Sequence, residues 1–205
     1  DIYDGGAGLD RAALNNPLLT DAQTGVTVDL AIQGVAQDTG HGMDTLINIE
    51  NVSAGGFADT MYGNSGDNWI WGAGGNDLLD GRDGNDLLEV GAGNATVVGG
   101  AGTDTLSFFN NSDFTGGVTA SLLLQGAAQT TNGSSSVNAS GIENLSGSSF
   151  SDTLTGDGGN NTLAGRQGAD TLNGGGGDDV LLGDGMISMT SRQGGSGPIT
   201  VVDDM

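Results

Sequence analysis

The chain has 205 residues, of which 41 are glycine, and its 26 acidic residues against 4 basic ones give a net charge of −22. So negative a surface repels nucleic acid and anionic lipid, and we expect neither nucleic-acid binding nor membrane insertion. Cysteine is absent, which excludes disulfides and thiol chemistry, and the single histidine, His41, cannot form a catalytic pair alone, so we expect no enzyme.

The first pattern in the chain is a nine-residue unit, GGAGLDRAA, at residues 5 to 13, with Asp10 at its sixth position. Residues 25 to 32 alternate apolar and polar side chains, which predicts one longer strand. Residues 39 to 47 form a partial unit that is out of phase with the units that follow. The whole segment 14–44 interrupts the period, and we interpret it as an enlarged rung or flap rather than a separate domain, since it is too short for its own core.

Residues 54 to 107 form six consecutive units with no insertion: AGGFADTMY, GNSGDNWIW, GAGGNDLLD, GRDGNDLLE, VGAGNATVV and GGAGTDTLS. The fourth position is glycine in five units, and the eighth is apolar in all six. A unit with one apolar position in nine cannot bury a core alone, so the units must stack on one another. Positions seven to nine suit a very short strand whose middle side chain points inward, and the glycine-rich remainder suits a turn.

The sixth position of these six units is acidic or amidic in all but one, and reads Asp59, Asn68, Asp77, Asp86, Ala95 and Asp104. In a stack, such residues form a column of like charges that needs a cation, and few basic residues are near. Carboxylate and carbonyl oxygens suit calcium, whereas the chain has no thiolate or histidine cluster for zinc. We therefore predict several bound Ca²⁺ ions and a chain that folds when calcium binds.

In these units the chain resembles the RTX, or haemolysin-type, calcium-binding repeat family, whose unit is G-G-x-G-x-D-x-U-x with U apolar. The resemblance implies an all-β fold, a right-handed parallel β-roll or β-helix solenoid, here with two enlarged non-repeat rungs. It also implies that two units make one rung and that calcium lies between turns two units apart. The best pairs are then Asp59 with Asp77 and Asp86 with Asp104, whereas Asn68 opposite Asp86 predicts a weaker site and Ala95 supplies no ligand.

The second half of the chain repeats the first at a spacing near 93 residues. Residues 147–182 read GSSFSDTLT, GDGGNNTLA, GRQGADTLN and GGGGDDVLL, and the segment 108–137 corresponds to 14–44. We expect residues 1–98 and 99–185 to be two copies that are continuous in one roll, with 186–205 as a cap, linker or tail. The pair Asp152 with Asp170 is the firmest here, and Asn161 with Asp179 is weaker. The predicted calcium ligands are Asp10, Asp59, Asn68, Asp77, Asp86, Asp104, Asp152, Asn161, Asp170 and Asp179.

Two further pairs of residues leave alternatives open. Glu50 and Glu143 fall at position six when the frame is extended backward, so each either closes a terminal calcium site or accepts a hydrogen bond from a backbone N–H. Trp69 and Trp71 flank the inward Ile70, so we expect both to point outward with Leu87 beside Trp69. They form either a contact surface for carbohydrate or protein, or a patch covered by the flap 14–44.

The resemblance implies a secreted bacterial protein, exported by a type I system to the cell surface or the extracellular space, where calcium is plentiful. Our leading hypothesis is a non-enzymatic calcium-binding structural module that serves as a rod, surface-layer or filament element, with lateral or end-to-end assembly of the chain with itself. The alternatives are a non-catalytic C-terminal accessory module of a secreted enzyme and a carbohydrate-binding adhesin face. An ice-binding face needs regular turn positions, and the third position of the units is irregular.

Overall fold

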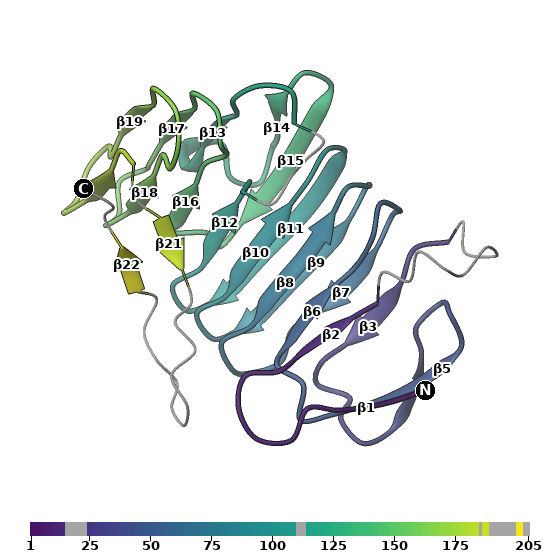
Figure 1. Cartoon of the computed structure of the whole chain (residues 1–205). Helices are drawn as coiled ribbons and strands as arrows, with labels where there is room; N and C mark the ends of the chain where they lie inside the picture. The colour runs from purple at the N-terminus through teal and green to yellow at the C-terminus, as the bar shows by residue number, and fades with distance from the viewer. Residues whose placement is uncertain (15–23, 110–113, 185, 189–199, 203–205) are drawn as a thin grey trace.

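The computed structural model describes residues 1–14, 24–109, 114–184, 186–188 and 200–202. Its strands wind into an elongated roll in which two parallel sheet faces lie against each other, as Figure 1 shows. Among the described residues the single helical element is a short 3-10 helix at Leu122–Leu124. The all-β parallel β-roll that the resemblance to the repeat family implies is confirmed.

One face of the roll is a sheet of eight parallel strands that runs through both copies of the repeat. In spatial order these strands are β2 (Arg11–Ala13), β6 (Asn51–Ser53), β8 (Trp69–Ala73), β10 (Leu87–Val90), β12 (Thr105–Ser107), β16 (Asn144–Ser146), β18 (Thr162–Ala164) and β20 (Val180–Leu182). The strand β10 pairs with β12 across the boundary between the two copies, so the sheet has no break there.

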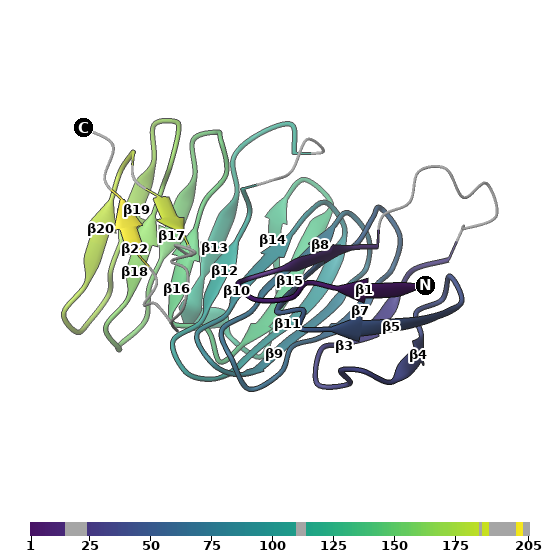
Figure 2. The ribbon, with the colours of Figure 1, turned by 60° about the horizontal axis from the view of Figure 1, so that its bottom comes forward.

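The opposite face consists of two sheets that follow each other along the roll. The first contains β3 (Thr27–Asp29), β7 (Thr60–Tyr62), β9 (Leu78–Asp83), β11 (Asn94–Ala101), β15 (Ser135–Ser140) and β14 (Ala128–Asn132). The second contains β13 (Thr119–Ser121), β17 (Thr153–Thr155) and β19 (Thr171–Asn173). Figure 2 shows the two faces stacked along the length of the molecule.

Eighth-position side chains fill the space between the two faces. Leu79 pairs in register with Met61 on one side and Val97 on the other, each 18 residues away, and all three are fully buried. Two nine-residue units therefore make one rung. Burial of each such side chain contributes about 1.5–3 kcal/mol to the free energy of folding, so the stability of the core is the sum of many contributions of similar size.

The two enlarged rungs each contribute one antiparallel strand pair to the otherwise parallel roll. In the first copy β4 (Ala36–Asp38) pairs with β5 (Met43–Ile47), and in the second β14 pairs with β15. Two further pairs lie near the ends of the chain: β1 (Ile2–Asp4), which is parallel to β5, and the antiparallel β21 (Met186–Ser188) with β22 (Thr200–Val202).

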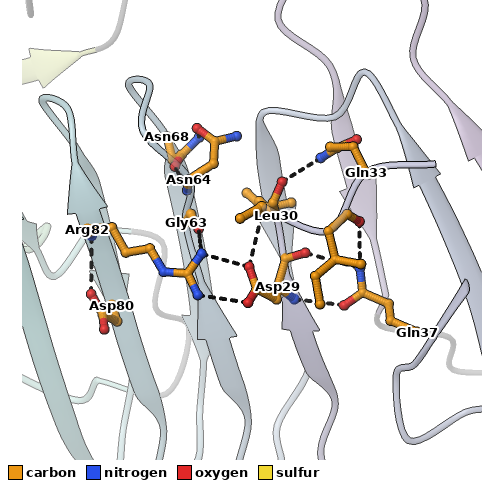
Figure 3. Close-up of polar contacts among 11 residues, drawn as sticks. Asp29, Leu30, Gln33, Gln37, Gly63, Asn64, Asn68, Asp80 and Arg82 are labelled. Carbon is orange, nitrogen blue, oxygen red and sulfur yellow. Dashed lines mark hydrogen bonds and ion pairs between the residues drawn. The ribbon is translucent and has the colours of Figure 1, made fainter. Parts of the chain in front are cut away.

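The prediction of one strand over residues 25–32 is wrong, because only Thr27–Asp29 is extended there. The Asp29 carboxylate accepts a hydrogen bond from the Ala31 N–H at 2.9 Å, which closes a turn directly after the strand. The Gln37 side chain occupies the place of a neighbouring strand, since its Oε1 accepts the Asp29 N–H at 2.8 Å and its Nε2 donates to the Asp29 carbonyl at 3.1 Å. Figure 3 shows this arrangement.

A basic side chain ties the first enlarged rung to the roll. The Arg82 guanidinium donates to both oxygens of Asp29, at 2.8 and 2.7 Å, and to the Gly63 carbonyl at 2.8 Å (Figure 3). It also lies over the Tyr62 ring, 5.3 Å from its centroid. The bidentate geometry uses the planar donor fork that distinguishes arginine from lysine.

Candidate metal centre

The sixth-position side chains form columns along the edges of the roll, with one residue per rung. The long column contains Asp10, Glu50, Asn68, Asp86, Asp104, Glu143, Asn161 and Asp179, and consecutive members are joined by hydrogen bonds from side chain to backbone. Two short columns contain Asp59 with Asp77 and Asp152 with Asp170.

One carboxylate oxygen of each pair is used to join two rungs. The Asp59 N–H donates to Asp77 Oδ1 at 3.0 Å, and the Asp86 N–H donates to Asp104 Oδ1 at 2.8 Å. The same bond joins Asp152 to Asp170 at 2.8 Å, and the amidic members show it at Asn68 with Asp86 (2.8 Å) and Asn161 with Asp179 (2.9 Å). The structure thus brings together all five pairs that the sequence predicts.

The second carboxylate oxygen has no partner within the protein in half of the predicted ligands. This unpartnered, buried atom is Oδ2 of Asp10, Asp59, Asp86, Asp104 and Asp170. A buried anionic oxygen without a partner costs several kcal/mol, because it has lost its water and gained nothing in exchange. These oxygens point to a cation that would complete their coordination.

A backbone carbonyl faces the same space as the unpartnered oxygen. A Cβ at Gly81 would lie 2.1 Å from Asp86 Oδ2 and 2.8 Å from the Gly99 carbonyl oxygen of the next rung. A Cβ at Gly165 would likewise lie 2.2 Å from Asp170 Oδ2 and 2.7 Å from the Gly183 carbonyl. The first-position glycine therefore keeps open a small space lined by a carboxylate and a carbonyl.

This donor set fits calcium, which takes carboxylate and backbone carbonyl oxygens in flexible geometry. No group of three or more His, Cys, Asp and Glu side chains converges anywhere in the described part of the chain. An ion in these turns would therefore be held by one or two carboxylates together with turn carbonyls and water. All-protein cages of carboxylates are not needed for this mode of binding.

Burial changes the proton affinity of these carboxylates when no cation is bound. It raises the pKa of Asp59 to about 6 and, with the added charge of Asp59, the pKa of Asp77 to about 7. It raises the pKa of Asp86 to about 8, together with nearby carboxylates, and that of Asp104 to about 6. A cation that binds here at neutral pH must therefore compete with protons.

The two asparagines of the long column close their turns with their own amide groups. Asn68 Oδ1 accepts the Asn64 N–H at 2.7 Å, and its Nδ2 donates to the Glu50 carbonyl at 2.7 Å. In the second copy, Asn161 Nδ2 likewise donates to the Glu143 carbonyl at 2.8 Å. An NH₂ group thus stands where an aspartate would present an oxygen, which is a physical reason for the weaker sites predicted at these two positions.

The turn that contains Ala95 departs from the pattern at two positions at once. Its first residue is Val90 instead of glycine, and both side chains are buried, at 3% and 7% exposed. The carboxylate and the glycine that leaves room for it are therefore lost together, and apolar side chains take their place. This agrees with the expectation that Ala95 supplies no ligand.

Glu50 and Glu143 contact backbone N–H groups, which was one of the two alternatives that the sequence left open. Glu50 accepts the Asp10 N–H at 2.9 Å and Glu143 accepts the Asp104 N–H at 2.8 Å.

Two backbone segments that complete the short columns were not predicted from the sequence. The Val26 N–H donates to the Asp59 carboxylate and the Val118 N–H donates to the Asp152 carboxylate, both at 2.7 Å. Their shared Gly-Val-Thr sequence, 92 residues apart, is the signal that marks them.

Trp69 is held by neighbours within the chain rather than left open. It pairs in register with Leu87, as predicted, and its indole N–H donates to Glu89 at 3.0 Å. The Arg11 guanidinium lies over its ring, 5.1 Å from the centroid. These contacts satisfy the polar edge and the face of the ring, while contact of the Trp69–Trp71 surface with carbohydrate or protein stays a prediction.

A comparison with protein families matches the chain to the RTX calcium-binding nonapeptide repeat in four copies, at residues 53–88, 89–107, 139–172 and 155–185. The matched repeats bind calcium ions, and they contain nine of the ten predicted ligands, Asp10 being the exception. A search of curated proteins finds no significant match. No helix in the described residues is both long and apolar enough to cross a membrane.

Proposed function

Because this chain carries RTX calcium-binding nonapeptide repeats and belongs with that family, we propose that it is a structural module of a secreted bacterial protein that folds on calcium and serves as a rod, surface-layer or filament element. The repeats themselves are calcium-binding and structural, not catalytic. The observation that carries the proposal is the set of buried Oδ2 atoms with no partner in the protein. They make the folded state costly until a cation arrives.

The proposed ligands are the carboxylates of the columns with the carbonyls of the facing turns. The acidic members are Asp10, Asp59, Asp77, Asp86, Asp104, Asp152, Asp170 and Asp179. Asn68 and Asn161 would contribute less, since their amide nitrogens already donate to carbonyls. Free calcium is scarce in the cytosol and plentiful outside, which supports a chain that is exported, by a type I system, before it folds.

We further propose that residues 1–98 and 99–185 act as one mechanical unit. The parallel pairing of β10 with β12, which crosses the boundary, supports this. A sheet that is continuous across the two copies is also compatible with the alternative role, an accessory module attached to a secreted enzyme.

Calorimetric titration tests the proposal. The 205-residue chain should bind several Ca²⁺ ions and only weakly Mg²⁺, which demands a tighter octahedral shell. The double variant Asp86→Asn with Asp170→Asn should bind fewer ions. Equal binding of Ca²⁺ by the variant and the native chain would show that these columns are not the sites.

A further inference from the structure

Each of the two enlarged rungs contains an exposed loop. The first loop, residues 30–35, joins β3 to β4, and the second loop, residues 122–127, joins β13 to β14. Both loops present apolar side chains to water, since Val35 and Leu123 are exposed. The carboxylate columns of the metal centre include no residue of either loop, so the loops are held by other contacts.

A glutamine side chain closes the base of both loops in the same way. Gln37 accepts the Asp29 N–H at 2.8 Å and donates to the Asp29 carbonyl at 3.1 Å. Gln129 accepts the Ser121 N–H at 2.7 Å and donates to the Ser121 carbonyl at 3.0 Å. The two loops therefore share the closure of their backbone, and they differ in the side chain at the base, which is aspartate in the first and serine in the second.

The aspartate at the base of the first loop is held by an arginine of the roll. The Arg82 guanidinium, which extends from β9 past β7 to β3, forms two hydrogen bonds to the Asp29 carboxylate and one to the Gly63 carbonyl (Figure 3). The repeat spacing near 93 residues makes Ser121 the counterpart of Asp29. Gly175 is the counterpart of Arg82, so this charged link is specific to the first copy.

Arg82 is also part of a turn that carries a proposed calcium ligand. It is the second residue of the unit that begins at Gly81, and Asp86 is the sixth. The backbone of Arg82 has a φ of 73°, in the left-handed region that is unfavourable for a residue with a side chain. Gly81 lines the space at Asp86 Oδ2, which is buried without a partner. The turn 81–86 therefore combines a strained arginine backbone with an uncompensated carboxylate oxygen.

We propose that Arg82 is a positioning residue that couples calcium binding in the turn 81–86 to the attachment of the first loop. This inference rests on the proposed function, since it needs an ion at Asp86. When Asp86 is coordinated, the turn holds the backbone of Arg82 in place and its guanidinium on Asp29. Without calcium the turn relaxes, and the first loop loses its link to the roll. Thermodynamic linkage makes the effect reciprocal, so breaking the link weakens calcium binding in this turn by the same factor.

The contact geometry explains why this position carries arginine and how strong the coupling should be. The planar guanidinium donates to both oxygens of Asp29 and to the Gly63 carbonyl at once, which is a bidentate arrangement that lysine cannot reproduce. The side chains of Arg82 and Asp29 are 33% and 25% exposed, so water screens the ion pair. We therefore expect a coupling of about five- to tenfold in calcium affinity, at the lower end of the usual range for coupled sites.

Hydrogen–deuterium exchange of the 205-residue chain during a calcium titration tests the coupling site by site. Asp29→Asn removes the charge from the ion pair but keeps an oxygen for the Ala31 N–H. In this variant the first loop should exchange faster in saturating calcium, and half-protection of the turn 81–86 should need about five- to tenfold more calcium. The second loop and the turn 165–170 should behave as in the native chain.

Asp86→Asn tests the reverse direction of the coupling. It removes the calcium ligand and leaves both members of the ion pair in place, so the first loop should lose protection while the second loop keeps it. Two matched controls are Ser121→Ala, at the counterpart of Asp29, and Asp170→Asn, which removes a calcium ligand from the other copy. Neither control should change the exchange of the first loop or of the turn 81–86.

Arg82→Lys is a further variant, which keeps the positive charge without the planar fork and should shift the same turn in the same direction. Circular dichroism of each variant in saturating calcium establishes that the roll still folds. An unchanged calcium requirement of the turn 81–86 in Asp29→Asn overturns the coupling. An equal change at the turn 165–170 also overturns it, because the ion pair then acts on the stability of the whole roll. If calcium protects neither turn in the native chain, the proposed function fails as well, so the two failures are distinguishable.

Discussion

The two carboxylate oxygens of one aspartate side chain have different roles in this roll. In Asp104 the Oδ1 atom accepts the Asp86 N–H at 2.8 Å, while the Oδ2 atom is buried without a partner. The first oxygen fixes the position of the carboxylate, and the second is left for an ion. A site of this kind is pre-positioned by the backbone but is unfavourable until it is filled.

Without calcium, the fold should therefore become more stable as the pH falls. Burial gives Asp59, Asp77, Asp86 and Asp104 pKa values of about 6 to 8 in the fold, above the ordinary 3.8. A raised pKa stabilises the fold fully below about pH 4, and this stabilisation is lost as the pH rises through about 6 to 8. Thermal melts of the calcium-free chain should show increasing order from pH 8 down to about pH 5, and a metal-free fold that is most stable at pH 8 would contradict this.

A substitution of Asn68 by aspartate should create a stronger site at the cost of metal-free stability. Asn68→Asp replaces an NH₂ that donates to the Glu50 carbonyl with an oxygen that faces it. The calcium titration should gain one tight site, and any residual order in calcium-free buffer should decrease. Asn76→Asp is the matched control, because it adds the same charge at an exposed turn position outside the columns. Equal changes in both variants would mean that net charge, not the column, governs binding.

At the scale of the nine-residue unit, the first-position glycine has a steric role. A Cβ on Gly81 would lie 2.1 Å from Asp86 Oδ2, inside the space in which the carboxylate and the Gly99 carbonyl converge. The turn with Val90 and Ala95 lacks both the glycine and the carboxylate, whereas the unit that begins with Ala54 keeps the carboxylate of Asp59. At Gly81 the missing Cβ thus leaves room beside the carboxylate.

Gly81→Ala should remove one calcium site and destabilise the calcium-bound roll by about 1–3 kcal/mol, the usual cost of overpacking. Chemical denaturation in saturating calcium measures the change in the free energy of unfolding. Gly158→Ala is the control, since its Cβ would meet nothing within 4 Å. If both substitutions cost the same, the glycine acts through chain flexibility and not through the space it leaves.

Much of each element could be predicted from the period, and the exceptions have identifiable causes. The pairing of Asp86 with Asp104 follows from stacking units two apart, so the sequence spacing suffices for it. The length of β3 could not be predicted, because Gln37, from eight residues further on, satisfies Asp29 in place of another strand. The orientation of the Asn68 amide also depends on two backbone groups, the Asn64 N–H of the same turn and the Glu50 carbonyl of the preceding rung.

At the scale of the whole molecule, the repeat near 93 residues determines the architecture together with the nine-residue repeat. A spacing near 93 residues places a hairpin of the same kind, β4–β5 and β14–β15, once in each copy. With a net charge of −22, however, chains repel one another unless the carboxylates are neutralised. Folding and assembly should therefore respond to the same ion.

The most direct test of the central claim is far-ultraviolet circular dichroism of the 205-residue chain as calcium is added to calcium-free buffer at neutral pH. The buried, unpartnered carboxylates predict a largely unfolded spectrum without calcium and a strand-rich spectrum with it, and magnesium at the same concentration should not replace calcium. Identical strand-rich spectra in chelator and in calcium would contradict the claim that the ion holds the roll together.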